Sequence, residues 1–330
     1  MIKKVLSAGT VMAAALLLAS CSAGGGSSAG SDDSATASGG EGKEICYITA
    51  AESHAYATPA NEAFQAAADE AGAKVTMLSQ DFDVQTGTEQ LTTCIGRNPD
   101  GIVLWPLDPQ AYIPGLIQAQ TAGIPIVLIN SPMDDEALKL VASFTGPDVY
   151  EEGVLSADAM DEALGGKGGV VIIAGQAGNG TSIGRTDGFT EQLEKIGSDI
   201  EVLQTVNADF DQQKALVASR DLITRFGDDI SGVYANDDTM ARGFIDAWAE
   251  AGKDPASIPP IVGINGQKDA FESIRAGQFF ATIVQSPVED GKLALETIVR
   301  AADGETVEAR IPIPLTVVTA DNVEDVEPAF

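Results

Sequence analysis

Short apolar runs alternate with longer amphipathic stretches along most of the chain. The short runs are rich in Val and Ile with little polar alternation, which is typical of parallel strands buried on both faces. They predict strands at Ile45–Ala50, Lys74–Leu78, Gly101–Trp105, Pro125–Ile129, Val141–Phe144, Val170–Ala174, Glu201–Thr205, Gly232–Ala235, Ile261–Ile264 and Ala281–Gln285. The longer stretches predict helices at Pro59–Ala71, Thr86–Arg97, Pro109–Ala122, Thr181–Ile196, Asp211–Phe226, Thr239–Ala251 and Val288–Ala302. This alternation predicts a doubly wound α/β fold.

One segment of this pattern occurs twice. The run Pro125–Asn130 has an echo in Pro260–Asn265, and each follows a predicted helix that ends in Ala-Gly. Both runs end in asparagine. The repeat predicts two similar lobes, each with its own sheet.

The N-terminus has the features of a bacterial export signal. Lys3 and Lys4 precede a short apolar stretch, Val11–Ala19, so residues 1–20 are expected to be a signal peptide. The run Leu18-Ala19-Ser20-Cys21 resembles the lipobox of lipoproteins, which implies lipidation of Cys21 and an extracytoplasmic location at the bacterial membrane. An ordinary signal peptide before an incidental cysteine is the alternative. Residues 21–43 are mostly Gly, Ser, Ala, Asp and Thr, a composition that predicts a flexible tether.

The remaining composition limits the partners of the protein. A net charge of −30 argues against nucleic acid, because the phosphate backbone would be repelled. Cys46 and Cys94 remain after Cys21, in a compartment that permits disulfides. The first lies in the first predicted strand and the second on the second predicted helix. A disulfide and a pair of buried thiols both fit this placement.

Polar and aromatic side chains collect after the predicted strands. In open α/β sheets the ligand sits beyond the carboxyl ends of the strands. The residues found there are Glu52, Ser53, His54, Tyr56, Trp105, Asp108, Asn130, Ser131, Arg185, Asp237, Asp238, Asn265 and Gln285. Amides, carboxylates and a guanidinium bind hydroxyl groups, and aromatic rings stack on the apolar faces of a sugar.

The same set is poorly suited to catalysis. His54 is the only histidine, no serine has an evident base partner, and CxxC and HExxH spacings are absent. The glycine-rich loop Gly175–Gly184 lacks the lysine of a phosphate-binding loop, so a tight turn with a helix N-cap at Thr181 competes with phosphate binding. The sequence therefore predicts no enzymatic activity, no cofactor and no metal.

Five short motifs resemble one family of proteins. They are Arg185–Phe189, Ala208–Asp211, Tyr234–Ala241, Val262–Gly266 and Ala281–Pro287. In this order and spacing they resemble the ribose- and galactose-type sugar-binding proteins of ABC transporters, the type I periplasmic binding proteins. The resemblance covers about Glu44 to Thr319.

This resemblance implies two Rossmann-like lobes that close on a ligand about a hinge of three crossover strands. The crossings are expected near Gly146-Pro147, Gln285–Pro287 and Pro312–Pro314. The N-terminal lobe would comprise residues 44–146 plus 287–313, and the C-terminal lobe residues 147–286 plus 314–330.

The resemblance also implies a set of ligand contacts. Carried over by position, they are Ser53, Tyr56, Asn130, Ser131, Arg185, Phe210, Asp237, Asn265 and Gln285. Strand-end geometry adds His54 and Trp105. Other interpretations compete: Asp237 as a helix cap (although Asp238 fits that position better), Phe210 and Trp105 as core residues, and His54 as a solvated loop residue.

The chain departs from the ribose binders at several of these positions. An Asp-Arg pair is replaced by Asn130-Ser131, an aspartate by Asn265, and an asparagine and two phenylalanines after the first strand by Ser53 and Ala55-Tyr56. Charge-assisted hydrogen bonds are lost, so the resemblance supports the class of protein but not ribose as its ligand.

The resulting expectation is a monomeric, extracytoplasmic solute-binding protein. It would capture a small neutral sugar or polyol by hinge closure and deliver it to the permease and ATPase of an ABC importer. A ligand-sensing protein that feeds a chemoreceptor or sensor kinase is the alternative. The effector lobe of a repressor is disfavoured by the signal peptide.

Overall fold

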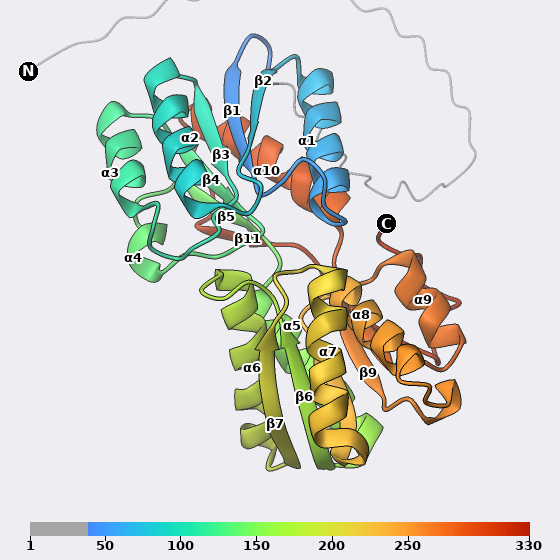
Figure 1. The fold of residues 1–330 in the computed structure, drawn as a ribbon. Coiled ribbons are helices and arrows are strands. Elements are labelled where there is room, and N and C mark those ends of the chain that lie inside the picture. The colour runs from blue at the N-terminus through green and yellow to red at the C-terminus, as the bar shows by residue number, and fades with distance from the viewer. Residues whose placement is uncertain (1–38) are drawn as a thin grey trace, which may run out of the picture. The chain divides into compact units, whose positions relative to one another are not determined.

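A computed structural model describes residues 39–330 of the chain. The predicted signal peptide, the lipidation site Cys21 and most of the predicted tether lie outside these residues. The described chain forms two six-stranded sheets, each flanked by helices (Figure 1). Within residues 39–330, no helix combines the length and the apolar character needed to cross a membrane.

The first sheet has the strand order β11-β5-β4-β3-β1-β2 and is entirely parallel. Its strands are β1 (Glu44–Thr49), β2 (Lys74–Ser79), β3 (Gly101–Leu104), β4 (Ile126–Ile129), β5 (Ser143–Gly146) and β11 (Arg310–Pro312). Its helices are α1 (Ala57–Ala71), α2 (Val84–Arg97), α3 (Ile113–Ala122), the single turn α4 (Asp135–Leu138) and α10 (Pro287–Ala302). We call these elements the N-lobe.

The second sheet has the order β12-β10-β9-β8-β6-β7, with β12 antiparallel to β10. Its strands are β6 (Lys167–Ala174), β7 (Asp199–Asn207), β8 (Ile230–Ala235), β9 (Ile261–Asn265), β10 (Ala281–Val284) and β12 (Thr316–Thr319). Its helices are α5 (Val149–Leu164), α6 (Gly180–Ile196), α7 (Gln212–Phe226), α8 (Asp238–Glu250) and α9 (Lys268–Arg275), with short 3₁₀ turns η1 (Gly227–Asp229) and η2 (Pro255–Ser257). We call these elements the C-lobe.

Each sheet is buried on both faces, which confirms the doubly wound architecture. In β1, Ile45 and Tyr47 pack in one core cluster with α1 and α10, whereas Cys46 and Ile48 pack in another with α2 and α3. The second sheet has the same arrangement, with α7, α8 and α9 over one face and α5 and α6 over the other. Both faces of each strand therefore bury apolar side chains, as the sequence pattern predicts.

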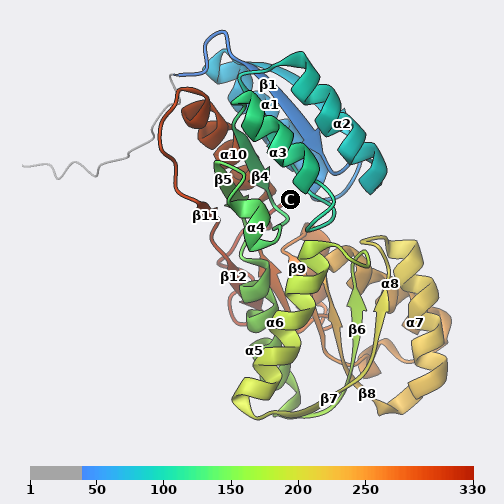
Figure 2. The same cartoon turned by 90° about the vertical axis from the view of Figure 1, so that its left-hand side faces the viewer.

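The chain passes between the two sheets three times. It leaves the first sheet after β5, returns to the N-lobe between β10 and α10, and crosses again between β11 and β12. Figure 2 shows β11 beside the upper sheet and β12 beside the lower one. Because β11 and β12 lie at sheet edges and are three and four residues long, they carry little hydrophobic pattern. Neither strand was predicted from the hydrophobic pattern of the sequence.

Helix α5 was also missed, for a different reason. Its buried face is made mostly of small residues, among them Gly153, Ser156, Ala157 and Ala159. A Cβ on Gly153 would lie 2.3 Å from the main-chain oxygen of Arg185, so α5 and α6 approach closely there. Helices were predicted from the periodic spacing of apolar residues. Because small residues give only a weak periodic pattern, α5 could not be recognised in this way.

A disulfide joins β1 to α2 in the N-lobe. Cys46 and Cys94 are bonded, with their Cα atoms 5.9 Å apart and 48 positions apart in the sequence. The order β3-β1-β2 places α2 across β1, as the disulfide requires. Of the two alternatives left open by the sequence, the structure has the disulfide.

Candidate functional site

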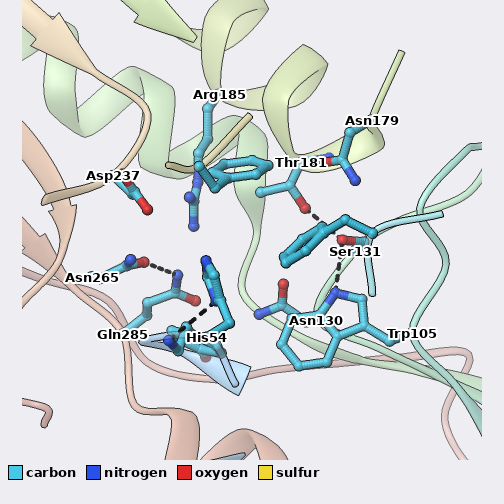
Figure 3. A pocket seen from close by; sticks show the side chains of 13 residues that line it. His54, Trp105, Asn130, Ser131, Asn179, Thr181, Arg185, Asp237, Asn265 and Gln285 are labelled. Atoms are coloured by element: carbon cyan, nitrogen blue, oxygen red, sulfur yellow. Dashed lines mark hydrogen bonds between the residues drawn. The ribbon is translucent and has the colours of Figure 1, made fainter. Parts of the chain in front are cut away.

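A cavity of about 40 Å³ lies at the carboxyl ends of strands from both sheets (Figure 3). Residues of the N-lobe and of the C-lobe contribute to its wall. The lining residues are His54, Tyr56, Phe82, Trp105, Asn130, Ser131, Asn179, Thr181, Arg185, Phe210, Asp237, Asn265 and Gln285. Ten of the eleven residues predicted to bind ligand are in this set. The remaining one, Ser53, is exposed and does not line the cavity.

Phe82 was not predicted to be a site residue, although it lies in a repeated motif. Asp81-Phe82-Asp83 in the N-lobe matches Asp209-Phe210-Asp211 in the C-lobe. Both phenylalanines adopt left-handed backbone conformations, with φ of 58° and 57°. Such φ values are unusual for a bulky residue and persist where the surroundings enforce them. In both loops the second aspartate caps the next helix, accepting the amide of Thr86 or of Lys214.

Asn179 closes the N-terminus of α6 and also bridges the lobes. Its Oδ1 accepts the amides of Thr181 and Ser182, while its Nδ2 donates to the main-chain oxygen of Leu107, 3.2 Å away in the N-lobe. The prediction of Thr181 as the N-cap was therefore wrong. The cap lies two residues earlier, and the Thr181 hydroxyl instead hydrogen-bonds that of Ser131 across the lobes at 2.7 Å.

Arg185 is held by a buried ion pair that was not predicted from the sequence. Its Nε donates to Glu152 at 2.7 Å and its Nη1 to the main-chain oxygen of Asn236, also at 2.7 Å. The side chains are 3% and 0% exposed. Burial raises the pKa of Glu152, although the Arg185 charge opposes this shift. Nη2 of Arg185 has no hydrogen-bond partner among residues 39–330, so one edge of the guanidinium is free for a ligand.

Asp237 caps α8 and faces the cavity. Its Oδ1 accepts the amide of Met240 at 2.7 Å. The sequence favoured Asp238 as the cap, which was wrong: Asp238 is fully buried and accepts from Thr282 and from the amide of Gln267. Burial raises the pKa of Asp237 to about 6, although the Met240 amide and the Arg185 charge act in the opposite direction. Figure 3 shows its carboxylate near the Arg185 guanidinium, on the same side of the cavity.

Asn130, at the end of β4, is oriented by a buried carboxylate from α10. Its φ is 63°, and its Nδ2 donates to Asp290 at 3.1 Å. The Tyr56 hydroxyl donates to the same oxygen of Asp290 at 3.3 Å. Burial raises the pKa of Asp290 to about 7, while its hydrogen bonds with Asn130 and Tyr56 oppose the shift. Asp290 does not line the cavity itself, and therefore acts through these two neighbours.

Asn265 is the counterpart of Asn130 at the end of β9. Its φ is 120°, and its Oδ1 accepts from Gln285 Nε2 at 2.8 Å. The other amide atom of Gln285, Oε1, is buried with no hydrogen-bond partner in the described chain. Gln285 thus presents an unused acceptor at the cavity.

His54 presents an unused donor. Its Nδ1 accepts the amide of Tyr56 at 3.3 Å, so the proton of the neutral ring is on Nε2, which is buried without a hydrogen-bond partner in the described chain. Burial lowers the pKa of His54, which favours the neutral ring, although the nearby main-chain oxygen of Phe210 opposes the shift. The ring packs edge-on against Phe82, with the ring centres 5.1 Å apart.

Comparison with known proteins places the chain among binding proteins. Residues 45–306 match the model of the periplasmic binding protein domain. The chain is 28% identical to the xylitol-binding protein of Mycolicibacterium smegmatis over 289 residues, 88% of this chain and 80% of that protein. It is 32% identical to the D-allose-binding periplasmic protein of Escherichia coli over 224 residues, 66% of this chain and 71% of that protein.

Solved structures give the same result. An ABC transporter solute-binding protein from Bacillus halodurans with bound myo-inositol has a TM-score of 0.79 and 27% identity, covering 87% of this chain and 97% of that one. A solute-binding protein from Mycobacterium smegmatis with bound glycerol also has a TM-score of 0.79 and 27% identity, covering 86% of this chain and 96% of that one.

Proposed function

The chain belongs to the periplasmic binding protein domain family, and on that premise we propose that it captures a small neutral sugar or polyol outside the cytoplasm for an ABC importer. The ligands named for its relatives support this proposal. Xylitol, D-allose, myo-inositol and glycerol are all uncharged molecules with several hydroxyl groups.

The observation that carries the proposal is the set of unused hydrogen-bonding atoms at the cavity. Nε2 of His54 and Nη2 of Arg185 are donors, whereas Oε1 of Gln285 and the second oxygen of an ionised Asp237 are acceptors. A hydroxyl group donates and accepts at once, so a molecule with several hydroxyls satisfies both kinds. The aromatic rings of Phe82, Phe210 and Trp105 supply apolar contact for its carbon skeleton.

The charges at the cavity favour a neutral ligand. The Arg185 guanidinium is already paired with the Glu152 carboxylate, and Asp237 adds a second carboxyl group. An anionic sugar would therefore meet no uncompensated positive charge among these groups. The cavity of about 40 Å³ has room for roughly three water molecules, which argues against an oligosaccharide.

The finer parts of the proposal concern closure and location. We propose that the lobes close on the ligand about the three crossings, that the protein works as a monomer without enzymatic activity, and that lipidated Cys21 anchors it to the membrane. Hydrogen bonds between the lobes support closure. They run from Asn179 to Leu107, from Ser131 to Thr181, and from Gln176 Nε2 to the main-chain oxygen of Phe82 at 3.1 Å.

A ligand screen tests the function. The protein from Lys43 onward is melted with glycerol, xylitol, myo-inositol, D-allose, D-ribose and D-glucuronate, and hits are confirmed by calorimetry. At least one neutral member should raise the melting temperature and D-glucuronate should not. Stabilisation by the anion alone would contradict the proposal. Deleting the gene should also abolish uptake of the same ligand at low concentration.

One substitution then tests the site. Gln285→Leu removes both the unused acceptor and the donor to Asn265 in a side chain of similar size, so binding should weaken at least roughly tenfold. The control is Gln118→Leu, at an exposed position on α3 that does not line the cavity, which should bind as the wild type does. If Gln285→Leu binds within a factor of two of the wild type, Gln285 does not contact the ligand.

A further inference from the structure

The segment that follows β12, residues 320–330, is fastened to the C-lobe along its length. We call it the tail segment. Val323 is buried in the core cluster of α7, α8 and α9. Glu324 pairs with Arg275 of α9 at 2.7 Å, and Arg275 also donates to the main-chain oxygen of Val323 at 3.2 Å. These contacts fix the path of the tail segment before its last residues.

The last residues of the tail segment are tied to the loop that carries Asn265. The amide of Ala329 donates to the main-chain oxygen of Gly266 at 2.8 Å. The amide of Lys268 donates to the main-chain oxygen of Phe330 at 2.9 Å. Gly266 directly follows Asn265 in the chain. The tail segment therefore braces the turn from β9 into α9, where Asn265 has an unusual φ of 120°.

The side chain of Phe330 contacts the other lobe. Its ring packs edge-on against Tyr56, with ring centres 5.8 Å apart and planes at 88°, and it joins the core cluster of the N-lobe. Tyr56 also meets Trp105 edge-on, at 5.9 Å and 87°. Figures 1 and 2 both place the end of the chain at the level where the two lobes meet. Phe330 is thus anchored to the C-lobe by its main chain and to the N-lobe by its ring.

We propose that Phe330 is a positioning residue of the ligand site and a latch for the closed arrangement of the lobes. The proposal rests on the function proposed above. Phe330 is not among the residues that line the cavity, so it acts through Tyr56 in one lobe and the Asn265 loop in the other. Its ring contact joins the lobes, and separating them would break it. The ligand therefore leaves more slowly while the ring stays in place.

The expected effect appears in ligand release. An aromatic contact of this kind corresponds to roughly a three- to tenfold change in an equilibrium or a rate. Phe330→Ala should raise the dissociation rate of the ligand about three- to tenfold and leave the association rate within a factor of two. The melting temperature of the ligand-free protein should not change, because Val323 and Glu324 still hold the tail segment.

Stopped-flow kinetics on three variants tests the proposal. Phe330→Tyr keeps the ring and should release ligand as the wild type does, which shows that the ring is the active feature. The control Glu327→Ala changes an exposed residue of the same segment and should have no effect. An unchanged dissociation rate in Phe330→Ala would overturn the proposal. So would a loss of ligand-free stability without a change in release, because that result indicates a purely structural residue.

A second measurement does not depend on the identity of the ligand. Spin labels at Thr92 on α2 and Asp221 on α7, both exposed, report the separation of the lobes in ligand-free protein. Phe330→Ala should shift the distances towards longer values than in the wild type or in Glu327→Ala. Identical distributions would refute the latch. If the wild type binds no sugar or polyol but the distances shift, the proposed function fails while the latch stands.

Discussion

Replacing Asp290 with asparagine isolates one buried charge next to the site. One carboxylate oxygen of Asp290 accepts from both Tyr56 and Asn130, and the carbonyl oxygen of an asparagine would accept from both as well. The other oxygen is buried with no hydrogen-bond partner among residues 39–330. Asp290→Asn therefore keeps the shape and the two hydrogen bonds but removes the titrating group.

The direction of the effect follows from the shifted pKa. Burial, with a smaller contribution from the Glu152 charge, raises the pKa of Asp290 to about 7 in the folded protein, whereas an unfolded aspartate has a pKa of about 3.9. Between these values the folded state binds more protons than the unfolded state, so the free energy of unfolding falls as the pH rises. The stabilisation is complete below about pH 4 and is lost as the pH passes through about 7. From pH 5 to pH 8 this residue should lower the stability of the wild type by about 2–3 kcal/mol.

Urea unfolding of ligand-free protein at pH 5, 6, 7 and 8 measures the effect. The stability advantage of the variant over the wild type should grow by about 2–3 kcal/mol between pH 5 and pH 8. Asp237, whose pKa burial raises to about 6, contributes the same background to both proteins, so the difference between them reports Asp290 alone. Asp221→Asn, on the exposed face of α7, is the control for removing a carboxylate. Parallel pH profiles for Asp290→Asn and the wild type would refute the reasoning.

Two further variants test closure and the disulfide. In Gly180→Ala the new Cβ would lie 2.5 Å from the main-chain oxygen of Pro132 in the other lobe, so closure of the lobes should be blocked. Ligand affinity, measured by calorimetry, should fall. The melting temperature of the ligand-free protein should stay unchanged. Gly96→Ala, on α2 with open space around it, is the control and should bind normally with up to about 1 kcal/mol of added stability. Replacing Cys46 and Cys94 with serine should lower the free energy of unfolding by about 4 kcal/mol, measured in urea, whereas ligand affinity should stay the same. Unchanged stability would show that the disulfide contributes nothing to the N-lobe.

The fold could be predicted from the sequence because the central strands consist almost entirely of apolar residues. Both faces of each central strand are buried, and the resulting Val- and Ile-rich runs stand out from the helices between them. The rule that ligands sit beyond the carboxyl ends of strands then gathered residues from distant parts of the chain, such as His54 and Gln285, at one cavity. The repeat ending in Asn130 and Asn265 pointed to two lobes with separate sheets, which the structure has.

The partners of the site residues could not be predicted in the same way. Glu152 lies on α5, a helix that the hydrophobic pattern did not predict because its buried face consists mostly of small residues. Asp290 lies in the first turn of α10, 160 positions after its partner Asn130. Neither contact has a sequence signature. The helix caps failed for a related reason: whether Asp237 or Asp238 caps α8 depends on the main-chain angles at the end of β8, which composition does not reveal.

The repeated elements also indicate how the cavity orients a ligand. Asn130 and Asn265 end equivalent strands, and Phe82 and Phe210 occupy equivalent loops, so the two lobes contribute matching amides and rings. A cavity built only from such pairs would accept a ligand equally well in two opposite orientations. The charged groups break this symmetry, because Arg185 and Asp237 both come from the C-lobe. With the ligand class proposed above, hydroxyls that need charged partners should therefore face the C-lobe. On this proposal the matching residues provide the shape of the site, and the unmatched charges select one orientation of the ligand within it.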